Sequence, residues 1–233
     1  MTLKTNWQNY YRRFIGTREY FKLSPSHLIF EALEDYFDLY CKDRRVLDVG
    51  AGEMTYRFLI KPLAREYITI DKYPAHPDLD IIADAGAMPL QDESFDTVFC
   101  SQVLEHSPRP MAVLKEISRV LKKDGIAIIT VPHLSYLHGE PEDFFRYTKY
   151  GLKELCAEAG LTDLKIIPLG GLLSFIFTPC SILMLSVFGT IPVIGRIVYI
   201  INYYLSKLVL FADKKFDKNK VFALNYLGIF KKT

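Results

Sequence analysis

Residues 45–52 read Arg-Val-Leu-Asp-Val-Gly-Ala-Gly, an apolar strand that runs directly into a glycine turn. Glycines here let a ligand approach the backbone, and we expect a helix to open directly after the turn and offer its free N–H groups. A dinucleotide-binding turn would have another glycine three residues after Gly52, where this chain has Thr55. The stretch therefore predicts a βα nucleotide-binding unit but argues against a pyrophosphate ligand.

A carboxylate follows at the end of the next predicted strand. Asp71 lies roughly twenty residues after the glycine turn, where an acidic side chain can accept hydrogen bonds from both hydroxyls of a ribose. This contact suits any adenosine cofactor.

Around this unit, short apolar runs alternate with amphipathic segments over residues 44–131, which is typical of βαβ units on a parallel sheet. The predicted strands cover residues 45–49, 67–70, 80–83, 95–100, 126–131, 164–168 and 221–230, and the predicted helices cover 26–41, 111–121 and 148–159. We expect the first helix to start near Ser24, Pro25 or Ser26 and to lie over the sheet. The second should end on Lys122, Lys123 and Gly125. The fold class is therefore α/β, with a doubly wound, mostly parallel sheet of seven strands.

Composition and charge exclude several classes of protein. The chain has 233 residues, of which 29 are Lys or Arg and 27 are Asp or Glu, so its net charge of +2 predicts no nucleic-acid binding driven by bulk charge. Its cysteines form no CxxC pair, which argues against a disulfide framework and a zinc cluster. The first residues lack the apolar middle of a secretory signal, and we expect a cytoplasmic protein.

The motifs, taken in order, resemble those of class I S-adenosylmethionine-dependent methyltransferases. They are residues 48–52, Asp71, Asp84-Ala85 followed by 88–90, and 92–96 leading to 101–106. Residues 138–148 (His-Gly-Glu-Pro-Glu-Asp-Phe-Phe-Arg-Tyr-Thr), with 151–152 and 159–160, resemble a bacterial subgroup of the type 11 methyltransferases, often associated with cell-envelope glycan synthesis. The resemblance implies a Rossmann-like methyltransferase fold with an antiparallel last strand, and S-adenosylmethionine as cofactor.

The resemblance also implies roles for individual residues. The glycine turn, Gly50-Ala51-Gly52, would pack against the methionine and ribose parts of the cofactor. The other implied contacts are Asp48 near the cofactor's amino group, Asp71 on the ribose hydroxyls, Asp84 and the Ala85 N–H on the adenine, and Ser101 and Gln102 beside the sulfonium. The chain departs from the family at Met54, where many members have a third glycine.

A hydroxyl acceptor needs a base, and the polar residues after the fourth and fifth strands face the predicted cofactor. These residues are Glu105, His106, His133, His138, Glu140, Asp143 and Arg146. We take His138 and His106 as candidate bases, and Asp143 and Arg146 as candidate substrate contacts. The alternatives are that His106 braces the helix starting near Arg109 and that Asp143 and Arg146 form a structural ion pair. Quinol-type O-methyltransferases carry an ExxEH cluster thought to favour a metal, but its first position here is Gln102, so we expect no metal.

A long apolar segment lies before the last strand. No Asp, Glu, Lys or Arg occurs between Lys165 and Arg196, and Pro and Gly residues divide the segment into two helices, about 172–188 and 196–211. If the last two strands are antiparallel, this hairpin leaves and re-enters at the carboxyl edge of the sheet and overhangs the active site. Lysines at 207, 214, 215, 218 and 220 favour contact with an anionic membrane. A homodimer interface or ordinary core is the alternative.

The sequence thus predicts an N-terminal helical cap (1–43), a methyltransferase domain (44–168 and 221–233) and an apolar helical insertion (169–220). The expected reaction is O-methylation of a glycan or lipid-linked cell-envelope acceptor by a protein held peripherally or monotopically on the inner face of the membrane. Methylation of a quinone or another lipophilic small molecule is the first alternative. A cofactor-binding scaffold without catalysis is the second.

Overall fold

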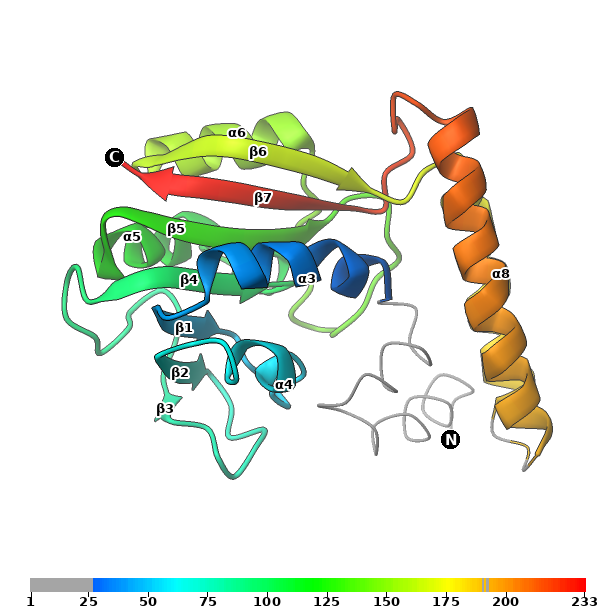
Figure 1. The fold of residues 1–233 in the computed structure, drawn as a ribbon, viewed down its shortest axis with the longest axis horizontal. Helices are drawn as coiled ribbons and strands as arrows, with labels where there is room; N and C mark the ends of the chain where they lie inside the picture. Colours follow the sequence, from blue (N-terminus) through cyan, green and yellow to red (C-terminus); the bar gives the residue numbers. More distant parts are fainter. Residues whose placement is uncertain (1–26, 190, 192) are drawn as a thin grey trace.

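The computed structural model describes residues 27–189, 191 and 193–233 (Figure 1). The expected helix start at Ser24, Pro25 or Ser26 lies outside these residues. The first described helix, α3, spans His27–Tyr40, inside the predicted range 26–41.

The seven-stranded sheet predicted from the sequence is present. Its strands are β1 (Arg45–Val49), β2 (Glu66–Asp71), β3 (Ile81–Ile82), β4 (Phe95–Ser101), β5 (Leu121–Pro132), β6 (Leu161–Leu169) and β7 (Asn225–Lys232). They lie in the order β3-β2-β1-β4-β5-β7-β6. The pairs among β1 to β5 are parallel, and β7 is antiparallel to both of its neighbours. The doubly wound α/β fold with an antiparallel last strand is therefore confirmed.

Helices cover both faces of the sheet and bury two apolar cores. On one face α3 and α4 (Arg57–Ile60) pack, and on the other α5 (Pro110–Val120) and α6 (Lys149–Glu158) (Figure 1). In β1, Val46 belongs to the core under α3, whereas Leu47 and Val49 belong to the core under α5. Burial on both faces explains why apolar residues lie on both faces of this five-residue strand, of which three residues are apolar.

The turn after β1 differs from the prediction. Residues 52–56 form turns, and the following helix α4 has only four residues and begins at Arg57. Met54 has φ of 58° and its side chain is buried. A left-handed residue cannot continue a right-handed helix, so a helix cannot open directly after Gly52. The conformation also explains why glycine suits this position in similar sequences.

The end of α5 and the start of β7 also differ from the prediction. Leu121 is extended (φ −68°, ψ 138°), so α5 ends at Val120 and the chain enters β5 at once. Lys122 therefore does not end a helix; its Nζ lies 2.7 Å from a carboxylate oxygen of Asp96. The last strand begins at Asn225, not at residue 221, because residues 221–224 bring the chain back from the insertion.

The predicted helical hairpin consists of α7 (Leu172–Phe188) and α8 (Ile194–Phe216). Asn225 pairs with Pro132 on one side and Leu169 on the other, so the hairpin leaves and re-enters at the carboxyl end of the sheet, where it stands upright (Figure 1). Asp213 of α8 accepts hydrogen bonds from the Leu173 and Ser174 N–H groups at 2.8 and 2.9 Å. A side chain of α8 thus caps the start of α7.

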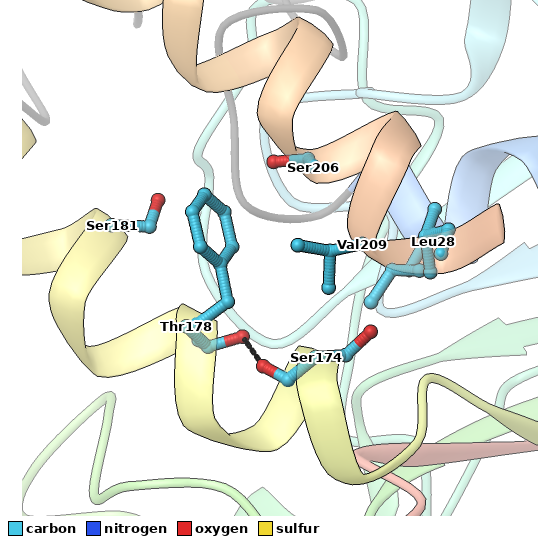
Figure 2. A pocket seen from close by; sticks show the side chains of 8 residues that line it. Leu28, Ser174, Thr178, Ser181, Ser206 and Val209 are labelled. Carbon is cyan, nitrogen blue, oxygen red and sulfur yellow. Dashed lines mark hydrogen bonds between the residues drawn. The ribbon is translucent and has the colours of Figure 1, made fainter. Parts of the chain in front are cut away.

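The polarity of this hairpin is reversed relative to a soluble helix pair. Its buried residues are mostly small or polar: Ser174, Ser181, Ser186, Gly195, Asn202, Ser206 and Asp213, with Leu185 and Tyr199. The Ser181 hydroxyl donates to the Asn202 side-chain oxygen at 2.7 Å, and Figure 2 shows Ser174, Ser181 and Ser206 around the narrow space between the helices. In contrast, Leu183, Leu208 and Phe211 are 63%, 62% and 71% exposed.

Candidate active site

A cavity of about 310 Å³ opens at the carboxyl ends of β1, β2 and β4. Five residues that the sequence assigned to the cofactor line it: Gly50, Asp71, Asp84, Ala85 and Gln102. The other four, Asp48, Ala51, Gly52 and Ser101, are not among its lining residues. The structure therefore places residues predicted to contact the ribose, the adenine and the methionine part of the cofactor around one cavity.

Asp71 is held in a fixed orientation at the end of β2. Its Oδ2 accepts a hydrogen bond from the Gly52 N–H at 2.8 Å, and its Oδ1 accepts one from the Tyr73 N–H at 2.9 Å. A carboxylate oxygen has more than one acceptor site, so both oxygens can still bind a ribose hydroxyl. The same contact fixes the glycine turn relative to β2.

Glycine is required at position 50 because the backbone there lies close to Val103, in the loop that follows β4. Its φ is +71°, and a Cβ atom there would lie 2.2 Å from Cγ2 of Val103. No other residue fits without displacing Val103, which also lines the cavity.

Two polar residues that the sequence reasoning missed, the buried Thr130 and the half-buried Tyr67, support this site. Thr130 of β5 is hydrogen-bonded to both Ser101 and Gln102. The hydroxyl oxygens of Thr130 and Ser101 lie 2.8 Å apart, and the Gln102 side-chain amide donates to the Thr130 hydroxyl at 3.2 Å. Tyr67 of β2 donates its hydroxyl proton to Asp48 Oδ2 at 2.5 Å. Burial raises the pKa of Asp48 to about 7, although the hydrogen bond from Tyr67 opposes that rise. Thr130 is the one polar residue among residues 126–131 of β5, which was a signal in the sequence, whereas Tyr67 lies among other polar residues of β2 and gave none.

A cluster of polar side chains beside the cavity brings two loops together. Glu105 and His106 belong to a 3-10 turn (Leu104–His106) after β4, and His138 belongs to the loop after β5. Glu105 Oε1 lies 3.9 Å from His106 Nε2 and 3.7 Å from His138 Nε2. The carboxylate of Glu105 and, less strongly, that of Asp143 raise the pKa of His138 against the effect of burial. The sequence pointed to both histidines but gave Glu105 no definite role.

Asp143 and Arg146 form a brace inside the loop. The two guanidinium nitrogens Nη1 and Nη2 donate to the two oxygens of Asp143 at 2.6 and 2.8 Å, and the remaining N–H groups donate to the carbonyls of Ser135, Tyr136 and Phe145. All five guanidinium donors are thus used. The side chain of Asp143 is 1% exposed and accepts the His138 backbone N–H at 2.8 Å, and its pKa is lowered chiefly by Arg146. This geometry favours the structural ion pair over a fork that grips the substrate.

Glu142 is a further residue that the sequence did not single out. Its carboxylate lies 2.7 Å from Lys72 Nζ and 3.2 Å from the Tyr73 hydroxyl, and its carbonyl oxygen contacts His106 Nδ1. It lines the cavity and ties the loop to the residues after Asp71. Neither His133, whose ring lies 5.3 Å from that of Tyr226, nor Glu140 lines this cavity.

Comparison with known proteins agrees with this fold. The sequence model of a family described as "Methyltransferase domain" matches residues 47–129. A probable S-adenosylmethionine-dependent methyltransferase of Mycobacterium tuberculosis is 32% identical over 102 residues, which cover 40% of this chain and 37% of that protein. A tRNA U34 carboxymethyltransferase of Sulfurimonas denitrificans is 24% identical over 170 residues, which cover 61% of this chain and 56% of that protein.

Solved structures share the fold over most of the chain. A putative methyltransferase from Bacillus halodurans has a TM-score of 0.57 and 17% identity, covering 86% of this chain and 97% of that one. A SAM-dependent methyltransferase from Archaeoglobus fulgidus has a TM-score of 0.56 and 21% identity, covering 90% and 95%.

Residues 47–129 thus match a methyltransferase domain, and the sheet with its helices has the fold found in S-adenosylmethionine-dependent methyltransferases. The match covers less than two thirds of the curated relatives' length, 56% and 37% for the two named above. The cell-envelope subgroup remains a prediction.

Proposed function

We propose that this protein transfers a methyl group from S-adenosylmethionine to an oxygen of a glycan or lipid-linked cell-envelope acceptor at the inner face of a membrane. The observation that carries this proposal is the α7–α8 hairpin, which is apolar on its outside and polar between its helices and is attached at the carboxyl end of the sheet.

The residues around the cavity fit the cofactor. Asp71 would hold the ribose hydroxyls, Asp84 and the Ala85 N–H the adenine, and Gly50 would let the backbone approach the ligand. When bound, S-adenosylmethionine supplies an electrophilic methyl group. The transition state disperses charge, so the residues around it act mainly by positioning the acceptor and excluding water.

An acceptor hydroxyl must also lose a proton. His106 lines the cavity, and His138 lies against it with ring centroids 5.0 Å apart. These two imidazoles are our candidates to hold or move that proton, with Asp143 and Arg146 keeping the loop of His138 in place.

The reversed polarity of the hairpin supports contact with lipid. Helices in a bilayer bury small and polar residues against each other and turn apolar residues outward, because lipid tails are as apolar as leucine. By length and composition, α8 is the one described helix that is long and apolar enough to cross a membrane, whereas α7 has 17 residues. Both ends of the hairpin are attached to the same end of the sheet, so they lie on the same side of a bilayer. The hairpin can therefore dip into the bilayer or cross it twice, but it cannot cross it once.

The charges at the base of the hairpin agree with an anionic surface. Lys214, Lys215, Lys218 and Lys220 follow the apolar part of α8, with Asp213 engaged in the cap of α7. Lys207, within the apolar part, is paired with Glu31 at 3.3 Å. Basic residues beside an inserted segment bind the negatively charged cytoplasmic leaflet.

A vesicle flotation assay tests membrane contact. We expect the full chain to float with phosphatidylglycerol vesicles and Leu208→Asp or Phe211→Asp to reduce the floating fraction several-fold. Leu39→Asp is the matched control, because Leu39 is 64% exposed on α3, away from the hairpin. Equal flotation of the wild type and the three variants, or no flotation of any of them, would argue instead that the hairpin is a homodimer interface, which sedimentation would detect.

A labelling experiment tests the acceptor. The protein is incubated with methyl-labelled S-adenosylmethionine and membrane extract, and we expect label in glycan or lipid-linked material. Label in the quinone fraction alone would support the lipophilic small-molecule alternative, and label in RNA would support an activity like that named for the tRNA-modifying relative. Cofactor binding without any labelled product would support a scaffold.

A further inference from the structure

We propose that Glu105, His106 and His138 form a binding site for a divalent metal ion of the zinc or manganese kind. Each residue offers one ligand atom, and these atoms lie within 4.8 Å of one another. Glu105 and His106 follow β4 and His138 follows β5, so the fold brings them together from two separate loops.

The state of Glu105 is the first argument. Its side chain is 0% exposed, and in the part of the chain that the structure describes neither carboxylate oxygen has a hydrogen-bond partner. Burying a carboxylate without a partner is costly, and such groups are normally paired or bound to a metal. A cation between Glu105 and the two imidazoles would offset that cost.

The hydrogen bonds of the imidazoles are the second argument. His106 Nδ1 contacts the carbonyl oxygen of Glu142, and His138 Nδ1 lies 3.2 Å from the carbonyl oxygen of Tyr136. Because a carbonyl only accepts, each Nδ1 carries the hydrogen, and the lone pair of each neutral ring lies on Nε2. Both Nε2 atoms face Glu105. A histidine that ligates a metal typically donates its other N–H to a carbonyl or carboxylate in this way.

The charged groups around His138 do not occupy its Nε2. Arg146 Nη2 and Asp143 Oδ2 lie 3.5 and 3.8 Å from Nδ1, on the opposite side of the ring, and these two residues neutralise each other. A protonated His138 paired with Glu105 is the competing explanation of the cluster. It differs from the metal site in requiring no added ion.

The ligand set indicates the class of metal and its role. Two imidazoles and one carboxylate suit zinc, manganese or iron, whereas magnesium and calcium prefer oxygen ligands. Three protein ligands leave a coordination position open, as in catalytic sites. His106 also lines the cofactor cavity. This role rests on the proposed function: a metal-bound acceptor hydroxyl would lose its proton more easily. With both Nε2 atoms bound to the metal, neither imidazole could also accept that proton, so in the metal-bound protein the ion would take over the role that we assign to the two histidines. The inference replaces the expectation, based on Gln102, that no metal binds.

Calorimetry on the chelator-treated full chain tests the site, with zinc chloride and manganese chloride as probes. We expect one ion per chain to bind, and affinity to fall at least tenfold in Glu105→Gln and in His138→Asn. His76→Asn is the matched control, since His76 lies in an exposed loop outside the cavity. Binding by the wild type that survives in both cluster variants, or no binding at all, would overturn the proposal.

Thermal unfolding guards against variants that simply misfold. Without metal, Glu105→Gln should be at least as stable as the wild type, because it removes an unpaired buried charge; added zinc should raise the Tm of the wild type but not of the variant. An equal rise in both would refute the site. Binding of S-adenosylmethionine is measured on the same samples. If the protein binds S-adenosylmethionine but no metal, only the metal site is refuted; if it binds metal but no S-adenosylmethionine, only the proposed function is refuted.

Discussion

Replacing Asp71 with alanine isolates the contact on which the cofactor assignment depends. The carboxylate accepts the Gly52 and Tyr73 N–H groups at 2.8 and 2.9 Å and lines the cavity beside Gly50. Hydrogen bonds to a charged group contribute about 1 to 3 kcal/mol each. Loss of the ribose contact should therefore raise the Kd for S-adenosylmethionine by about 5- to 150-fold.

Part of this loss would come from the glycine turn, which Asp71 also holds. Asp71→Asn separates the two contributions, because it keeps one acceptor oxygen for a backbone N–H but lacks the charge. We expect a smaller loss of affinity for Asp71→Asn than for Asp71→Ala, with both variants folded.

Isothermal calorimetry with S-adenosylmethionine measures the effect. Asp78→Ala is the control: Asp78 is exposed, lies in the loop before β3, and pairs with Arg57 at 2.5 Å outside the cavity. An Asp71→Ala variant that binds as tightly as the Asp78→Ala control would refute the assignment of Asp71 to the ribose.

Three further predictions concern stability. Burial raises the pKa of Asp48 from 3.8 to about 7, so ionisation of Asp48 is disfavoured in the folded state and the stability of the wild type should fall as pH rises from about 4 to 7. Asp48→Asn should remove this pH dependence and, at pH 8, be more stable than the wild type by up to about 4 kcal/mol in urea unfolding. Parallel profiles of stability against pH for the two proteins would contradict this prediction. Gly50→Ala should lower the free energy of unfolding by about 2 to 4 kcal/mol, because of the positive φ at this position and the contact of the new Cβ with Val103. Adding Val103→Ala should recover part of that loss. An unaltered urea midpoint in Gly50→Ala would show that the turn can relax. Replacing residues 170–220 with a short linker should leave a soluble chain that still binds S-adenosylmethionine, whereas aggregation of the product would place the hairpin in the core.

Much of the sheet could be predicted because its signals are local. Residues 46–49 of β1, which are apolar except for Asp48, are buried, and the acidic residue at the end of β2 lies where a nucleoside-binding strand would place it. The hairpin was predictable from its lack of charge. The antiparallel last strand then determined that the hairpin emerges at the carboxyl end.

The errors arose where backbone conformation overrides residue type. Met54 has a positive φ, which neither its side chain nor its apolar neighbours indicate, and this prevents a helix directly after Gly52. Lys122 and Gly125 resemble a helix end, but buried Leu121 pairs with Phe95 of β4 and draws the chain into the sheet. Tertiary pairing decided this boundary.

The polar cluster beside the cavity was only partly predictable, because its residues come from different loops and interact with one another only in the folded protein. The sequence named His106, His138, Asp143 and Arg146, but not which of them face the cavity. Glu105 became notable only once its carboxylate was seen to be buried beside both imidazoles. Thr130 and Tyr67 support their neighbours through contacts between adjacent strands, which no spacing in the sequence reveals.

The cap that Asp213 provides couples the two helices mechanically. Since α7 cannot separate from α8 without exposing its first N–H groups, the pair should tilt as one lever about its attachment near Leu169 and Leu224, which are joined by a hydrogen bond of 2.8 Å. A force on the far part of α8 would then be transmitted to the ends of β6 and β7, in the half of the sheet away from β1 and β2, whose ends border the cavity.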